Sequence, residues 1–145
     1  MRKLWLKYLC NMAIILVIVL LRVYITKLSK SYFNETFHMN LYLLSAIVLI
    51  NVLLGSLLGL EYLVKEIRSE GTWKINFPKF ILLGLPSLYC SIGIFSIYFP
   101  NKFLLYFFTK PLWSLLTYDV NILSLFQLMF GYIVVTSFYK ESKVS

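Results

Sequence analysis

The sequence predicts an all-α integral membrane protein, a four-helix bundle that forms one transmembrane domain over residues 1–145. Three observations predict this class. Only 14% of the residues are charged and 60% are hydrophobic, whereas about a quarter of the residues in a soluble domain are charged. Uncharged apolar runs of bilayer length recur along the chain. Basic residues lie at the ends of these runs, where membrane topology requires them.

The spans follow from the length of the apolar runs, because about 20 helical residues are needed to cross roughly 30 Å of hydrocarbon. Three runs contain no charged side chain: 41–60, 80–101 and 120–139. The first run, 8–21, is shorter, but the long side chains of Lys7 and Arg22 at its ends can reach the headgroups. We therefore predict four spans: 4–25, 41–63, 79–100 and 120–139.

The distribution of lysine and arginine predicts the orientation of these spans. With the N-terminus in the cytoplasm, nine of the fourteen basic residues fall on the cytoplasmic side and five fall outside. Cytoplasmic loops are enriched in basic residues, so we predict an N-in/C-in topology. Lysine is much commoner than arginine and alanine is rare, a bias typical of AT-rich bacterial genomes, so the expected location is the bacterial cytoplasmic membrane.

The second helix is expected to continue beyond the membrane. Glu61 and Lys65 form a favourable i, i+4 pair, and the apolar periodicity persists after them. The helix should therefore protrude into the cytoplasm as far as Glu70, with Gly71 as a left-handed C-cap.

The segment that follows, 72–79, alternates apolar and polar side chains. Alternation predicts an extended segment, which we place at the headgroup boundary with Trp73 as an interfacial anchor. Pro78 should open the third helix, because proline is favoured in a first helical turn.

The connection between the third and fourth spans, 101–119, is apolar and aromatic although it should be an outer loop. Lys110 and Pro111 interrupt it, so a fifth span is excluded. We expect an interfacial helix or a shallow re-entrant segment, with Trp113 as a second interfacial anchor. Asp119 should cap the start of the fourth span.

Small and polar residues form a helical face in each of the last three spans. Such faces let helix backbones approach closely, and Gly55 and Gly59 match the GxxxG pattern. A path for a polar solute and simple helix packing both explain the pattern, and packing is favoured. The residues of this helix-packing or polar face are Asn51, Gly55, Gly59, Gly84, Ser87, Ser91, Ser124, Gln127 and Gly131.

Four ionisable residues should lie at the membrane boundaries. Lys7 and Glu61 fall at the predicted inner boundary, and Arg22 and Asp119 fall at the outer one. We expect two boundary ion pairs, each of modest strength because the interface is wet. The alternative is that each residue contacts headgroups or caps a helix.

The sequence offers no evident catalytic chemistry. It contains one histidine, His38, and no glycine-rich phosphate loop, so we expect no metal site and no cofactor. Asp119 and Glu61 should lie on opposite faces of the membrane, which argues against a catalytic carboxylate pair. The net charge of +8 is spread over the ends of apolar runs, so we expect no nucleic-acid partner.

These expectations favour a small polytopic membrane protein that is not an enzyme and serves as a binding or accessory subunit of a membrane complex. Its partners would be the lipid bilayer and either another membrane protein or a second copy of the chain. Two alternatives remain from other functional classes: a small oligomeric transporter or pore, and a holin-like protein that remodels membranes.

Overall fold

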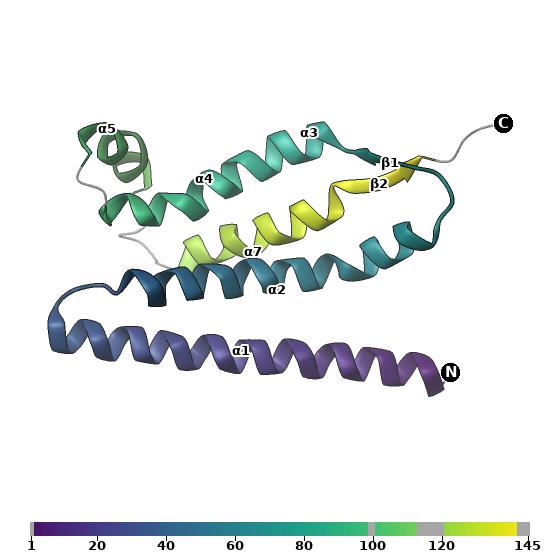
Figure 1. Cartoon of the computed structure of the whole chain (residues 1–145), viewed down its shortest axis with the longest axis horizontal. Helices are drawn as coiled ribbons and strands as arrows, with labels where there is room; N and C mark the ends of the chain where they lie inside the picture. The colour runs from purple at the N-terminus through teal and green to yellow at the C-terminus, as the bar shows by residue number, and fades with distance from the viewer. Residues whose placement is uncertain (1, 99–100, 113–120, 142–145) are drawn as a thin grey trace. The chain divides into compact units, whose positions relative to one another are not determined.

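The computed structural model describes residues 2–98, 101–112 and 121–141, and these residues are mostly helical (Figure 1). The chain forms two compact units, Met1–Ile50 and Asn51–Ser145. The boundary between them falls within a helix, and each unit is described by itself.

The first unit contains α1 (Arg2–Thr36) and the start of α2 (Leu41–Arg68). Two helices in the described part of the chain are long and apolar enough to cross a membrane by length and composition, Tyr8–Thr36 and Leu41–Arg68. At 1.5 Å per residue α1 is about 52 Å long and α2 about 42 Å, so both exceed the roughly 30 Å of a hydrocarbon core. The helix that contains the first predicted span, 4–25, therefore extends well past its end.

The turn between α1 and α2 is short and capped on both sides. Phe37 adopts φ 55°, a left-handed conformation, and its N–H donates to the carbonyl of Phe33 at 2.8 Å. The side chain of Asn40 accepts from the N–H groups of Tyr42 at 2.9 Å and Leu43 at 3.4 Å. A left-handed residue thus ends α1, and an asparagine N-cap starts α2.

The second unit contains a continuous helical rod over residues 77–98. It consists of α3 (Phe77–Lys79), the π-helix η1 (Phe80–Gly84), α4 (Leu85–Gly93) and the 3-10 helix η2 (Ile94–Tyr98). Asn76 caps its start by accepting from the N–H of Lys79 at 3.1 Å, and Pro78 lies in the first turn as expected. The π-helix precedes Pro86, whose ring would collide with the carbonyl four residues earlier in a regular α-helix.

Residues 102–112 and the helix α7 pack against this rod. The short helix α5 (Lys102–Leu104) continues into the π-helix η3 (Leu105–Thr109), and the helical turns reach Leu112. These turns lie at the end of α4 that is far from α3 (Figure 1). The helix α7 (Asn121–Thr136) runs between α4 and the second half of α2 (Figure 1).

The fold is mostly helical, as expected, but it also contains a short two-stranded sheet that the all-α expectation did not include. Strands β1 (Thr72–Ile75) and β2 (Phe138–Glu141) pair antiparallel, with Trp73 opposite Lys140 and Ile75 opposite Phe138. The N–H of Asn76 donates to the carbonyl of Ser137 at 2.8 Å and continues the ladder. An extended segment needs partners for its backbone groups, and the end of the chain supplies them for β1. The range 120–139 is therefore helical only to Thr136.

The expected C-cap at Gly71 is also wrong. The helix α2 ends at Arg68, and the N–H of Ser69 donates to the carbonyls of Lys65 and Glu66, both at 3.2 Å. The Ser69 hydroxyl donates to the Glu66 carbonyl at 2.7 Å as well. Gly71 adopts φ 145°, a glycine conformation that turns the chain into β1.

Candidate functional site

Glycines bring the backbones of α2 and α7 into direct contact. A Cβ atom on Gly55 would overlap the carbonyl oxygen of Leu128, and one on Gly131 would overlap the carbonyl oxygen of Val52. Only glycine fits at either position, so each helix places its glycine against the backbone of the other. The structure thus joins the small-residue faces that the sequence places on the second and fourth spans. We call this contact the α2–α7 interface.

A pair of buried amides lies in the α2–α7 interface. The Asn51 Nδ2 donates to the Gln127 Oε1 at 2.7 Å, and these side chains are only 3% and 2% exposed. The hydroxyl of Ser56 donates to the carbonyl of Val52 at 3.0 Å and lies 3.4 Å from the Gly131 carbonyl oxygen. The polar groups of the two helices therefore bind each other, which is what helix packing requires.

The remaining members of the predicted polar face lie close by. A Cβ atom on Gly59 would lie 3.0 Å from the Val135 side chain, so α2 follows α7 for a further turn. Gly84 is buried on the rod, and a Cβ there would lie 3.5 Å from Ile133 of α7. Ser124 is half-buried on α7.

The two serines of the rod, Ser87 and Ser91, are buried but bound within their own helix. Their hydroxyls donate to the carbonyls of Leu83 and Ser87, each at 2.7 Å. Because each hydroxyl is satisfied by the preceding turn, neither serine presents an unused donor to a ligand.

Charged side chains gather where the two strands meet the C-terminal ends of α2 and α7. We call this region the ribbon end, and its basic residues are Lys65, Arg68, Lys74, Lys79 and Lys140. The Lys79 ammonium donates to the carbonyl of Thr136 at 3.1 Å and to its hydroxyl at 2.7 Å. It also lies 5.7 Å and 5.8 Å from the ring centroids of Tyr132 and Tyr62. A cation at the C-terminus of α7 binds carbonyls that have no helical partner.

Lys140 caps α2 in the same way. Its ammonium donates to the carbonyl of Ser69 at 2.7 Å and of Ile67 at 3.0 Å, and lies 5.2 Å from the Trp73 ring centroid. Its backbone N–H donates to the Glu66 carboxylate at 2.9 Å. The second strand therefore holds the end of α2 through both its backbone and its side chain.

An ion pair crosses the two strands on their other face. Lys74 pairs with Glu141, and both side chains are largely exposed. The hydrogen bond and the negative charge of Glu141 raise the pKa of Lys74 above its ordinary value of 10.5. The ribbon end thus contains a lysine bound to each helix terminus and an ion pair between the strands.

The interactions at the ribbon end are not predictable from the sequence, and they involve Lys79, Lys140, Glu66 and Thr136. In the sequence, Lys79 and Lys140 each lie next to an apolar run, a position that also fits contact with lipid headgroups. Only the pairing of β2 with β1 brings Lys140 to the end of α2.

The other predicted site residues are placed as follows. Trp73 lies in β1 and is exposed, next to Lys140. Glu61 is exposed on α2, and Arg22 is half-buried on α1. Trp113, Asp119 and the side chain of Lys7 lie outside the residues that the structure describes. Both boundary ion pairs therefore stay predictions.

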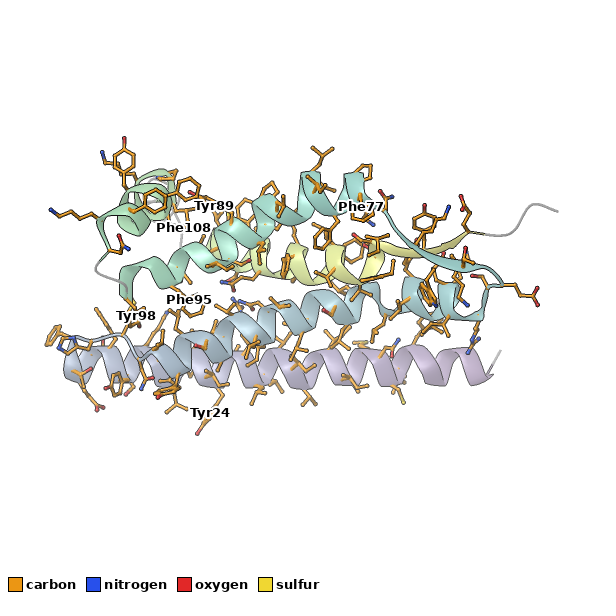
Figure 2. All side chains as sticks on the ribbon, turned by 45° about the horizontal axis from the view of Figure 1, so that its top comes forward. Tyr24, Phe77, Tyr89, Phe95, Tyr98 and Phe108 are labelled. Carbon is orange, nitrogen blue, oxygen red and sulfur yellow. The ribbon has the colours of Figure 1, made fainter. Side chains whose placement is uncertain are left out.

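An aromatic cluster fixes the turns of residues 102–112 to the end of α4. Tyr89 stacks on Phe108 with ring centroids 4.8 Å apart, and its hydroxyl donates to the carbonyl of Phe107. Figure 2 shows Tyr89 and Phe108 side by side, at the end of α4 opposite to Phe77. A Cβ atom on Gly93 would overlap the buried side chain of Leu112, so the two segments touch closely.

Two further observations concern metal binding and similarity to known proteins. Among the described residues, no group of three or more His, Cys, Asp or Glu side chains could hold a metal ion. Comparison of the chain with protein-family models, curated proteins and solved structures finds no match.

Proposed function

We propose that the chain is an integral membrane protein that serves as a binding or accessory subunit of a membrane complex and performs no catalysis. The observation that carries this proposal is the distribution of side chains in the second unit. Its buried polar residues are Asn51, Ser87, Ser91, Gln127, Thr136 and Ser137. Its exposed side chains include Leu82 at 71% and Leu125 at 61%.

This distribution fits lipid better than water. In water, exposed leucines on neighbouring helices form the apolar patches that mark membrane or partner contact. In a bilayer the outer surface is apolar, and hydrogen-bonded polar groups between helices hold the bundle together. The first unit supports the same reading, since residues 8–21 of α1 contain no charged side chain on any side of the helix.

The four-span N-in/C-in topology is part of this proposal. The crossings would be α1, α2, the rod over residues 77–98, and α7. Five basic residues lie at the ribbon end: Lys65, Arg68, Lys74, Lys79 and Lys140. The opposite end of the second unit has Lys102 and Lys110 among its described residues. This asymmetry supports a cytoplasmic ribbon end.

The α2–α7 interface supports a binding role over transport. A transporter or pore needs polar groups that face a solute path. Here Asn51 binds Gln127, and Gly55 and Gly131 close the interface with backbone contacts. The surfaces left for function are therefore the outer ones, which contact lipid or another protein.

Two measurements test the proposal. After alkaline carbonate extraction the protein should remain in the membrane fraction, and its purification should require detergent. A monodisperse protein in plain buffer would contradict the membrane assignment.

The accessory role is tested separately by gentle solubilisation followed by native gel electrophoresis and mass spectrometry. We expect the chain to migrate in a complex that contains a second protein in fixed stoichiometry. Recovery of the chain alone, at a mass that fits only its own copies, would contradict the accessory role and leave the membrane assignment standing.

A further inference from the structure

The outer side of residues 102–112 presents aromatic rings and a lysine on one face. Phe103, Tyr106, Phe107 and Lys110 have the i, i+3, i+4, i+7 spacing of a single helical face. Their aromatic members are 71%, 68% and 52% exposed. We call these four residues the aromatic face.

Contacts within the aromatic face order its side chains. The rings of Phe103 and Phe107 stack in parallel, with centroids 6.0 Å apart. The Lys110 ammonium lies 4.4 Å from the centroid of the Tyr106 ring. Phe108 and Leu112 hold the segment against Tyr89 and Gly93 of α4. Phe107 also meets the Tyr89 ring edge to face, with centroids 5.5 Å apart, while Phe103 and Tyr106 point away from these contacts and are mostly exposed.

The charge on this segment is only positive. Residues 102–112 contain Lys102 and Lys110 and no acidic residue, and both lysines are exposed. Exposed aromatic rings next to lysines fit the boundary between acyl chains and phosphate groups, since rings favour that depth and lysines attract anionic lipids.

Charge argues against a re-entrant segment. Insertion of residues 102–112 into the hydrocarbon would bring the exposed Lys110 with them, at a cost of several kcal/mol. An interfacial position satisfies both the rings and the lysines.

We propose that the aromatic face lies in the lipid interface and that Lys102 and Lys110 bind the phosphate groups of anionic phospholipids there. This inference rests on the proposed membrane function, and it chooses the interfacial option for this segment. The lipid class that the segment recognises is the anionic phospholipids.

The test places a nitroxide spin label at Phe103→Cys in the full chain. Cys10→Ser removes one native thiol, the buried Cys90 is kept, and the same protein without Phe103→Cys reports background labelling. The labelled protein is reconstituted into nanodiscs of phosphatidylcholine containing increasing fractions of phosphatidylglycerol. Accessibility to oxygen and to a water-soluble nickel chelate gives the depth of the label.

We expect the label to be open to oxygen and shielded from nickel, while a label at His38→Cys in the α1–α2 turn stays open to nickel. The phosphatidylglycerol fraction at half-maximal shielding should rise about fivefold for each of Lys102→Gln and Lys110→Gln. Lys27→Gln removes the same charge from α1 and should leave this midpoint unchanged.

Three results would overturn the inference. They are a Phe103→Cys label as open to nickel as the His38→Cys label, a label at the bilayer centre, and a label shielded from both reagents, which would mean that protein covers the face. Failure of the protein to enter nanodiscs would contradict the proposed membrane function as well. If the protein enters nanodiscs but the label is exposed to water, this inference is contradicted and the proposed membrane function stands.

Discussion

At Gly131 and Gly55 the close approach of two helices depends on the absence of a single carbon atom. At either position a methyl group would meet the backbone of the facing helix, which cannot rotate away as a side chain can. At Gly84, by contrast, a methyl group would lie 3.5 Å from the Ile133 side chain, an ordinary contact.

The first prediction follows from this difference. Gly131→Ala should destabilise the protein by about 1–3 kcal/mol, because overpacking forces the α2 and α7 backbones apart. Unfolding of the protein in detergent micelles by added denaturing detergent measures the effect. Gly84→Ala is the matched control and should change stability little. Equal stability of the two variants would contradict the described α2–α7 interface.

The second prediction concerns the buried amides. Asn51→Leu should cost about 1 kcal/mol, because it leaves the Gln127 amide without its partner in a buried place. Gln127→Leu should cost a similar amount for the same reason. The double variant should be more stable than the two single losses together imply, and a double-mutant cycle measures this coupling. If the stability loss of the double variant equals the sum of the two single losses, the two amides do not interact.

The third prediction is a pH dependence at the ribbon end. Glu141 raises the pKa of Lys74 in the folded protein, so the ion pair stabilises the ribbon fully below the ordinary lysine value of 10.5. That stabilisation is lost as the pH rises through the higher folded value. Fluorescence of Trp73 in a Trp5→Phe, Trp113→Phe background should report the alkaline step. Lys74→Gln should lack it, and an unchanged step in that variant would assign it to another group.

At the scale of elements, two lysines cap the C-terminal ends of α2 and α7, and for α2 the expected cap was Gly71. The ends of α2 and α7 carry carbonyl groups without helical partners, and Lys140 and Lys79 bind them. Neither helix relies on a glycine cap at its C-terminus, which is why the expected role of Gly71 fails.

The fourth prediction removes one of these caps. Lys79→Met keeps the length of the side chain but loses the cation at the Thr136 carbonyl, so we expect a loss of about 0.5–2 kcal/mol. Hydrogen exchange of the last turn of α7 should quicken before that of its middle. Lys65→Met, which changes an exposed lysine on α2, is the control. Uniform protection in the Lys79 variant would argue against a capping role.

The sequence indicates faces and elements better than it indicates their pairing. The helical spacing of Asn51, Gly55 and Gly59 shows that α2 has a packing face, since periodicity is a local property. That this face meets Gln127 and Gly131 of α7 depends on the topology of the whole second unit. Local spacing does not contain that information.

The second strand illustrates the same limit. Residues 138–141, Phe-Tyr-Lys-Glu, follow an apolar helical run and do not alternate apolar and polar side chains, so their local pattern does not predict a strand. What decides their conformation is β1, whose unpaired backbone groups lie far away in the sequence. The aromatic segment 102–112 was recognised from its composition, but its contacts with Tyr89 and Gly93 required the fold.

At the scale of the molecule, the second unit has two unlike ends. The ribbon end gathers basic residues from α2, β1, α3 and β2, whereas the other end presents the aromatic face. If α2 crosses the membrane, Lys30 on α1 and Arg68 at the end of α2 lie on opposite sides of it. In the topology that we propose, Arg68 faces the cytoplasm, because cytoplasmic segments are enriched in basic residues.

The fifth prediction tests this orientation with one added cysteine at a time in a Cys10→Ser background that keeps the buried Cys90. A membrane-impermeant maleimide added to intact cells should label Lys30→Cys, because that position would face outward. It should label Arg68→Cys only after the cells are opened. Labelling of Arg68→Cys alone in intact cells would reverse the orientation while keeping α2 as a span. Equal labelling of both positions from outside would mean that α2 does not cross the membrane, because a crossing helix must separate its ends by the bilayer that the reagent does not pass.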